Sequence, residues 1–124
     1  MIKQRVKKFW VYINNADFDQ LTEIMLADCN VILPNTKEIF KGCDNYIRFN
    51  KDYPGRWYAR VEKLVVAGDD AISAVEITND QGTSLYVTSF FKFEGEMIKE
   101  ITEYWGENGE APAWRKDKGY SEII

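Results

Sequence analysis

The first residues of the chain place apolar side chains at helical spacing. Apolar residues recur there every three or four positions, which predicts an amphipathic helix over residues 2–15. These apolar positions are Ile2, Val6, Phe9, Trp10 and Ile13. The basic residues between them are expected to form the solvated side of this helix.

Residues 17–28 carry a second, shorter helical pattern. Asp17 suits an N-cap, and Gln20 follows it three residues later in a relative of the capping box. The apolar stripe consists of Leu21, Ile24 and Met25. A second helix is therefore predicted, and it would form a helical hairpin with the first.

The next segment alternates between short extended and helical patterns. Two short strands around a turn are predicted at residues 30–34 and 38–41, and Gly42 ends the second of them. A third helix is predicted at residues 44–51. It should end at Tyr53-Pro54-Gly55, because proline disfavours a helical residue before it.

From Trp57 onward the apolar period changes from helical to alternating. Four strands are predicted, at residues 57–67, 71–78, 84–93 and 97–105. Short glycine-containing loops separate them, which is typical of antiparallel hairpins. Three helices followed by a curved antiparallel sheet indicate an α+β fold, with a conical sheet wrapped on the helices. Residues 1–124 are expected to form one domain, with the polar tail 106–124 packing over the sheet end or onto a partner subunit.

Composition narrows the chemistry that this fold can support. The chain has 124 residues and no histidine, which excludes Ser-His-Asp and Cys-His catalysis and histidine-ligated metal. No nucleotide-binding motif and no metal-ligand cluster is present in the sequence, so neither a cofactor nor a metal is expected. Four Trp, seven Tyr and seven Phe are many aromatic residues for a chain of this size.

Charge, hydropathy and cysteine content indicate which partners and which compartment to expect. The formal charge of −4 disfavours nucleic-acid binding, which needs a basic face. No stretch approaches the roughly 20 apolar residues that span a bilayer, and no signal peptide is recognisable, so no membrane partner is expected. A cytoplasmic protein is expected, with Cys29 and Cys43 as reduced thiols.

Two glutamates interrupt or end apolar series in the predicted strands. Glu76 shares a strand phase with Ile72 and Ala74, and Glu103 shares one with Met97, Lys99 and Ile101. If both faced the helices, burial would raise their pKa values and mutual repulsion would separate them, giving an acid and a base. Two alternatives stay open. Both could line a pocket without catalysis, or both could lie on the outer face as partners of Lys or Arg.

The aromatic residues are interpreted mainly as core, with some left to line a cavity. The candidate ligand-binding residues are Trp10, Phe40, Trp57, Phe91, Tyr104 and Trp105. A small apolar or aromatic ligand would fit such a lining.

The order of these elements and several short motifs resemble the SnoaL-like (polyketide-cyclase-like) branch of the nuclear transport factor 2-like superfamily. The motifs are Lys41-Gly42-x-Asp44-x-Tyr46-Ile47, Val75-Glu76, Phe90-Phe91, Ile98-x-x-Ile101-x-Glu103-Tyr104-Trp105 and Ala111-Pro112-Ala113-Trp114-Arg115. The resemblance implies a conical α+β barrel with a deep apolar cavity, often a homodimer through the outer face of the sheet.

The resemblance also bears on the two glutamates. Relatives similar to limonene-epoxide hydrolase carry acidic residues that align with Glu76 and Glu103, with an arginine between them. Ala74 stands at the position of that arginine here, which puts this type of epoxide hydrolysis in doubt. In polyketide-cyclase relatives a pocket aspartate acts as acid and base, and the resemblance suggests Glu103 as its counterpart here.

Binding of a small apolar or aromatic molecule in a conical cavity of a homodimer is the leading functional expectation. One alternative is a carboxylate-dependent cyclase, isomerase or hydrolase that uses Glu103 and Glu76. The other is a non-catalytic dimeric interaction module.

Overall fold

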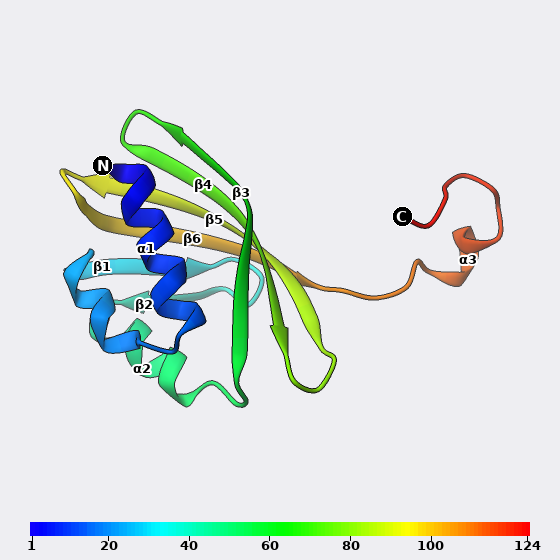
Figure 1. Cartoon of the computed structure of the whole chain (residues 1–124), viewed down its shortest axis with the longest axis horizontal. Coiled ribbons are helices and arrows are strands. Elements are labelled where there is room, and N and C mark those ends of the chain that lie inside the picture. The colour runs from blue at the N-terminus through cyan, green and yellow to red at the C-terminus, as the bar shows by residue number, and fades with distance from the viewer.

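A six-stranded sheet forms the frame of the computed structural model, which describes residues 1–124 (Figure 1). The strand order is β2-β1-β6-β5-β4-β3. The strands are β1 (Met25–Leu33), β2 (Glu38–Lys41), β3 (Trp57–Ala67), β4 (Asp70–Asn79), β5 (Ser84–Glu94) and β6 (Met97–Glu107). The helical elements are α1 (Ile2–Asn14), the 3₁₀ helix η1 (Phe18–Glu23), α2 (Cys43–Asp52) and α3 (Ala113–Lys116). None of these helices combines the length and the apolar character needed to cross a membrane.

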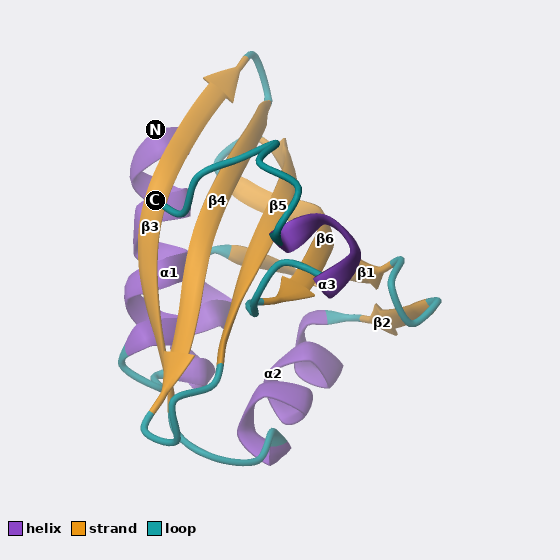
Figure 2. Cartoon of the chain, turned by 90° about the vertical axis from the view of Figure 1, so that its right-hand side faces the viewer, coloured by secondary structure: helices purple, strands orange, loops and turns teal.

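The sheet curls between β3 and β2, with α1 and α2 on its concave side (Figure 2). Strands β3 to β6 form the expected antiparallel meander. Strand β1 joins this meander by parallel pairing with β6, with Val31 opposite Ile101. The asparagine side chain of Asn35 strengthens this junction, because it donates to the carbonyl of Trp105 at 2.8 Å and accepts from the Trp105 N–H at 3.1 Å. The sheet stays open, since β2 and β3 are its edges.

The predicted α+β class, the first and third helices and the four meander strands are confirmed. The second predicted helix is wrong, because only a 3₁₀ helix forms at Phe18–Glu23 and the chain enters β1 at Met25. Asp17 makes no side-chain capping bond. The Ile98 N–H instead donates to the carbonyl of Ile24 at 2.8 Å, and pairing with β6 replaces a helix too short to be stable alone.

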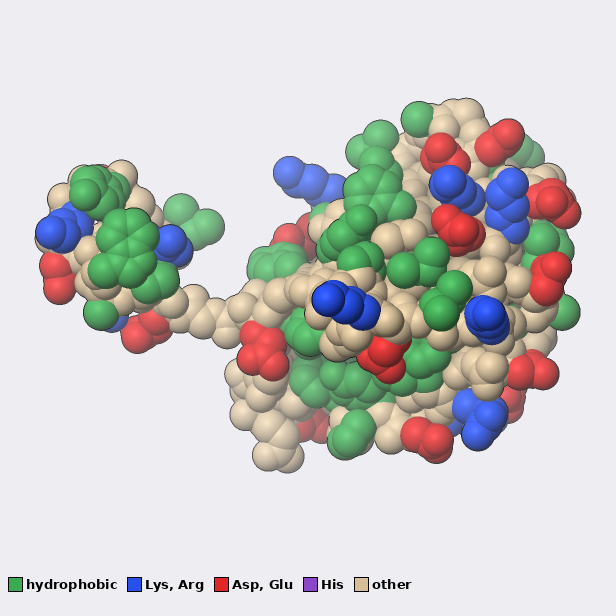
Figure 3. Space-filling view, turned by 180° about the vertical axis from the view of Figure 1, so that it is seen from behind, with side chains coloured by type: hydrophobic (Ala, Val, Ile, Leu, Met, Phe, Trp, Pro, Cys, Tyr) green, Lys and Arg blue, Asp and Glu red, His purple; other side chains and the backbone are tan.

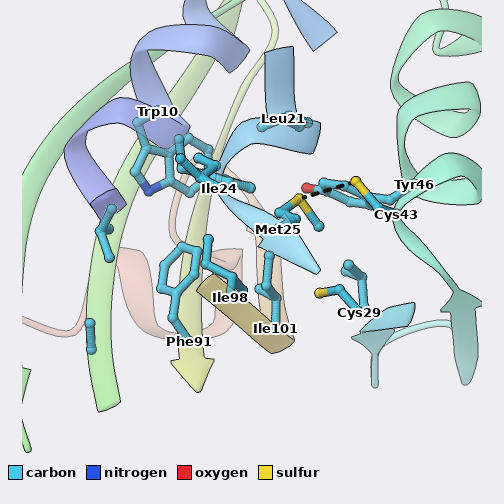
Figure 4. Close-up of a cluster of buried hydrophobic side chains, with 14 of the residues drawn as sticks. Trp10, Leu21, Ile24, Met25, Cys29, Cys43, Tyr46, Phe91, Ile98 and Ile101 are labelled. Atoms are coloured by element: carbon cyan, nitrogen blue, oxygen red, sulfur yellow. Dashed lines mark hydrogen bonds between the residues drawn. The ribbon is translucent and has the colours of Figure 1, made fainter. Parts of the chain in front are cut away.

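The core lies between the helices α1, η1 and α2 and the concave face of the sheet (Figure 4). Phe9 is fully buried, and its ring packs edge-on against Trp10 at 4.9 Å and Phe91 at 5.2 Å between centroids. Cys29 and Cys43 are buried free thiols near the start of α2. Burial raises the pKa of the Cys29 thiol to about 12 and that of Cys43 to about 11, so both remain uncharged and weakly reactive.

The chain after β6 leaves the body. Asn108 is the last residue bonded to the sheet, through its N–H to the carbonyl of Ser84 at 3.0 Å. Residues 109–124, called the arm below, extend away from the sheet and include the short helix α3 (Figure 1). The arm does not lie over the sheet end of its own chain.

Candidate functional site

A cavity of about 400 Å³ lies between α1, α2 and the concave face of the sheet. This volume falls within the range of small-molecule sites. Its wall is mostly apolar and aromatic and includes Trp10, Ile13, Phe18, Leu33, Tyr46, Phe49, Tyr53, Trp57, Ile77, Leu85, Val87 and Trp105. Buried side chains such as Trp10 and Tyr46 form the inner end, and exposed residues such as Thr36 and Arg56 form the rim.

A row of polar residues crosses the buried side of three strands. Ser73, Ser89 and Glu103 are the buried polar residues of the chain. Register places Ser73 opposite Ser89, and Ser89 opposite Glu103. The indole Nε1 of Trp10 donates to Ser73 Oγ at 3.0 Å, which holds α1 against this row.

Glu103 reaches the inner end of the cavity and is the one buried charged residue, with 7% of its surface exposed. Its Oε1 accepts from the Tyr46 hydroxyl at 3.0 Å, and its Oε2 accepts from Ser89 Oγ at 2.9 Å. Burial raises the pKa of Glu103, and these two hydrogen bonds oppose the rise. A carboxyl in this setting can donate a proton to a bound molecule or accept one from it.

Tyr46 supports Glu103 from α2. Burial raises the pKa of its hydroxyl well above the ordinary value, and the neighbouring Glu103 raises it further. Tyr46 therefore stays protonated and keeps donating to the carboxylate. Its ring is held by Phe9 and Phe49, at 6.3 Å and 6.2 Å between centroids.

Glu76 lies on the outer face of the sheet, so it cannot form a cavity pair with Glu103. Its Oε1 pairs with Arg60 Nη2 at 2.5 Å, across the register of β3 and β4. The inward residues of β4 are Ala71, Ser73 and Val75, so the phase that Glu76 shares with Ile72 and Ala74 faces outward. Ser73, in the inward phase, accepts the hydrogen bond from Trp10. Glu76 is the outer-face partner of an Arg, which is one of the alternatives that the sequence left open. Ala74, where epoxide-hydrolase relatives have arginine, shares this outer phase with its register partner Thr88.

Glu103 faces the cavity, which is one of the alternatives that the sequence left open, but the predicted phase that it shares with Met97 and Lys99 is interrupted. A β-bulge between β5 and β6 sets Phe93 opposite Ile98 and Lys92 opposite Glu100, which leaves Lys99 unpaired. Ile98 and Ile101 are therefore both buried.

The six aromatic candidates divide evenly. Trp10, Trp57 and Trp105 line the cavity. Phe91 lies in the core against Phe9, and Phe40 packs on Phe49 at 4.5 Å outside the cavity wall. Tyr104 is exposed on the outer face, edge-on to Phe90. Side chains alternate between the two faces along β6. Tyr104 follows the inward Glu103 and therefore points outward.

Sequence reasoning missed Tyr46 and Ser89 as site residues. Ser89 gave a recognisable signal, since it is the polar member of the inward series Leu85, Val87, Ser89, Phe91 and Phe93. Tyr46 was visible as part of a helical apolar stripe, but nothing in the sequence shows that its hydroxyl meets Glu103.

Two cations at the rim of the cavity are already engaged. Lys51 Nζ pairs with Asp19 at 2.7 Å, and Arg56 Nη2 donates to the carbonyl of Asn14 at 2.7 Å. The Arg56 guanidinium also stacks over the Tyr58 ring at 4.3 Å. Neither group bonds Glu103, so the inner end has no fixed counter-ion. No three Asp, Glu or Cys side chains are grouped to hold a metal ion.

Comparison with known proteins gives both a family and a set of similar folds. The family profile described as "SnoaL-like domain" matches residues 6–101. A candidate ketosteroid isomerase from Kribbella flavida DSM 17836 is 25% identical, with a TM-score of 0.86 over 99% of this chain and 89% of that one. That alignment includes the arm. A search of curated proteins returns no match.

Two further crystal structures share the fold. An NTF2-like protein of unknown function from Burkholderia xenovorans LB400 is 23% identical, with a TM-score of 0.83 over 99% of this chain and 94% of that one. A candidate SnoaL-like polyketide cyclase from Jannaschia sp. CCS1 is 16% identical, with a TM-score of 0.69 over 84% and 87% of the chains. With the profile match over most of its length, the chain belongs to the SnoaL-like family of the NTF2-like fold.

Proposed function

We propose that the cavity binds a small apolar or aromatic molecule that carries one polar group, and that Glu103 contacts this group. The observation that supports the proposal most is the position of Glu103, a single buried carboxyl at the inner end of an apolar cavity of about 400 Å³. The aromatic wall would contact the apolar part of the ligand. Each Glu103 oxygen already accepts one hydrogen bond and has capacity for another, so a ligand hydroxyl can be accommodated.

Binding can be tested with 2-naphthol, an aromatic probe that carries one hydroxyl. Three tryptophans line the cavity, so we expect saturable quenching of intrinsic fluorescence. Glu103→Gln should weaken binding about five- to tenfold, since it removes a hydrogen bond to a charged group. Glu76→Gln on the outer face is the matched control and should leave binding unchanged. Equal effects of the two substitutions, or no saturable quenching of the unmodified protein, would contradict the proposal.

Proton transfer by Glu103 is a second candidate function, and the raised pKa of this carboxyl favours it. In this case one carboxyl serves as both acid and base, because Glu76 is on the other face. The similarity to a candidate ketosteroid isomerase and a candidate polyketide cyclase is in line with such chemistry. The natural substrate would carry an acidic C–H beside a carbonyl.

Proton abstraction can be measured without the natural substrate. The α-protons of 2-tetralone exchange with deuterium in D₂O, and NMR follows their loss. We expect the protein to accelerate this exchange and Glu103→Gln to reduce the acceleration by about 10²-fold or more, the usual contribution of a general base. Glu76→Gln should retain it. A protein that binds 2-naphthol but does not accelerate exchange would be a binding protein and not a proton-transfer catalyst.

A second copy of the chain is the partner that we propose for the outer sheet face. Cross-strand register lines up Val65, Ile72, Phe90, Thr102, Ile32 and Ile39, one residue from each strand, and we call them the outer row. Several of its members are exposed, including Val65, Phe90 and Ile39. Every member except Thr102 is apolar, and an apolar row of this length is unusual on a surface without a partner.

A further inference from the structure

The arm forms no bond with the body of its own chain. The backbone hydrogen bonds beyond Asn108 run within the arm, from Arg115 and Lys116 to Pro112 and from Lys118 to Arg115. Its one ion pair, Lys116 Nζ with Glu110 at 3.4 Å, is also internal. The arm thus has local order without contact to its own sheet or helices.

Large apolar side chains of the arm are exposed. Trp114 is 66% exposed, Tyr120 is 72% exposed and Ile123 is 87% exposed. Burial of such side chains is favourable, and tryptophan and tyrosine are typical of protein interfaces. The four-residue helix α3 is too short to be stable alone, so its order also calls for a packing surface.

The arm is long enough to reach across a second molecule. It continues from the end of β6, away from the sheet (Figure 1). Residues 109–124 can span up to about 50 Å when extended. A six-stranded sheet is about 24 Å wide from its first to its last strand, at about 4.8 Å between neighbours.

The outer row is the apolar surface that matches the arm. Figure 3 shows this side of the molecule, with hydrophobic side chains exposed between charged ones, and with the arm joined to the body by a thin connection. Both surfaces belong to the same chain, so a two-fold dimer would let each arm meet the face of the other copy. The alignment with the Kribbella protein covers 99% of this chain and therefore extends into the arm.

We propose that residues 109–124 of one copy lie against the outer sheet face of a second copy, with Trp114 packed on the outer row. The arrangement is reciprocal, so two arms and two sheets form one dimer. This proposal depends on the one made above, that a second copy of the chain is the partner of the outer sheet face. The arm carries charges of both signs, and so does the face, so the contact is mainly apolar and should depend little on salt.

Sedimentation velocity of the full chain tests the proposal. Trp114→Ala should raise the dimer dissociation constant about tenfold or more, as expected for an interface tryptophan. Phe90→Ser on the outer row should have a similar effect, and the double variant should be less than additive because the two residues share a contact. Lys7→Ala, on the exposed side of α1, is the control and should change nothing.

The results separate this proposal from the simpler one of a sheet-to-sheet dimer. If Phe90→Ser dissociates the dimer and Trp114→Ala does not, the outer face is an interface but the arm is not part of it, and the proposal is overturned. A protein that is monomeric at all accessible concentrations overturns both. The 2-naphthol experiment is independent, since the cavity lies on the concave face.

Intermolecular cross-linking gives a second readout that survives a weak dimer. One copy carries Lys118→Cys in the arm and the other carries Thr88→Cys on the outer face, and the mixture is oxidised. The natural thiols of Cys29 and Cys43 are buried and should not compete. A disulfide between the two kinds of copy supports the proposal, whereas equal cross-linking of Lys118→Cys with Lys7→Cys on the opposite side would overturn it.

Discussion

On the concave face of the sheet, Glu103 is buried and accepts hydrogen bonds from two neutral hydroxyls, whereas on the outer face Glu76 pairs with the guanidinium of Arg60. Phe91 and Phe90 show the same contrast, since they are neighbours in β5 and are 1% and 43% exposed. The residue types are alike and the surroundings differ. The phase of the strand therefore determines the surroundings of a side chain. It decides whether a carboxyl lies beside a cation or is buried away from one.

The two phenylalanines give the largest expected difference between the faces. Phe91→Ala should lower the free energy of unfolding by about 3–5 kcal/mol, because it leaves a cavity beside Phe9. Phe90→Ala should lower it by less than about 1 kcal/mol in the monomer, because the side chain is already partly solvated. Urea denaturation at low protein concentration measures both. Similar losses would show that the outer row contributes to the core of a single chain.

Removing one hydroxyl from the buried row should have the next largest effect. Tyr46→Phe deletes the donor to Glu103 Oε1, and we expect a loss of about 1–2 kcal/mol. It should also raise the pKa of Glu103 further, because this hydrogen bond favours the ionised form. NMR titration of the labelled carboxyl carbon checks the direction. An unchanged Glu103 pKa would contradict the role assigned to Tyr46.

Glu103 should make stability depend on pH. Its pKa is raised on folding, so its contribution is most favourable below the pKa of an unfolded glutamate, roughly 4.3, and is lost as the pH rises through the higher folded value. Glu103→Gln should remove this loss and stabilise the protein by on the order of 1 kcal/mol at neutral pH. Denaturation midpoints across pH 4–8 measure the difference. The variant and the unmodified protein should converge at the acidic end.

The ion pair of the outer face should have the smallest effect. Arg60→Ala should change the free energy of unfolding very little, because the guanidinium is exposed and solvent screens the pair. The loss should shrink further when denaturation is repeated in high salt. A large, salt-independent loss would indicate that Glu76 is less solvated than its position on the outer face implies.

The sequence was sufficient for the order of the elements, because periodicity changes clearly at Trp57 and glycine marks the hairpin loops. It was not sufficient for the phase of β4, where Ser73 looks like an outward residue and is buried by its bond to Trp10, sixty-three positions earlier. The bulge at Lys99 was hidden for the same reason, since only the register against β5 reveals it. Local pattern predicts strands, whereas long-range partners decide which side chains face the cavity.

The same limit applies to residues 17–28. Leu21, Ile24 and Met25 are all buried, as a helical stripe would require, but they reach the core from a 3₁₀ turn and the start of a strand. Pairing with β6 decides between these structures, and β6 lies at the other end of the body. About half of the candidate site could be predicted from the sequence. Glu103 and the three tryptophans were recognised, whereas the contact of Tyr46 with Glu103 could not be.

The parallel pairing of β1 with β6 has a consequence for synthesis of the chain. Val31 meets Ile101, and Asn35 meets Trp105, seventy residues later. During translation, β1 would lack its β6 partner until β6 leaves the ribosome. We therefore expect the helices and the β3–β5 hairpins to form early and the closure of β1 on β6 to come last, as the slow step of folding.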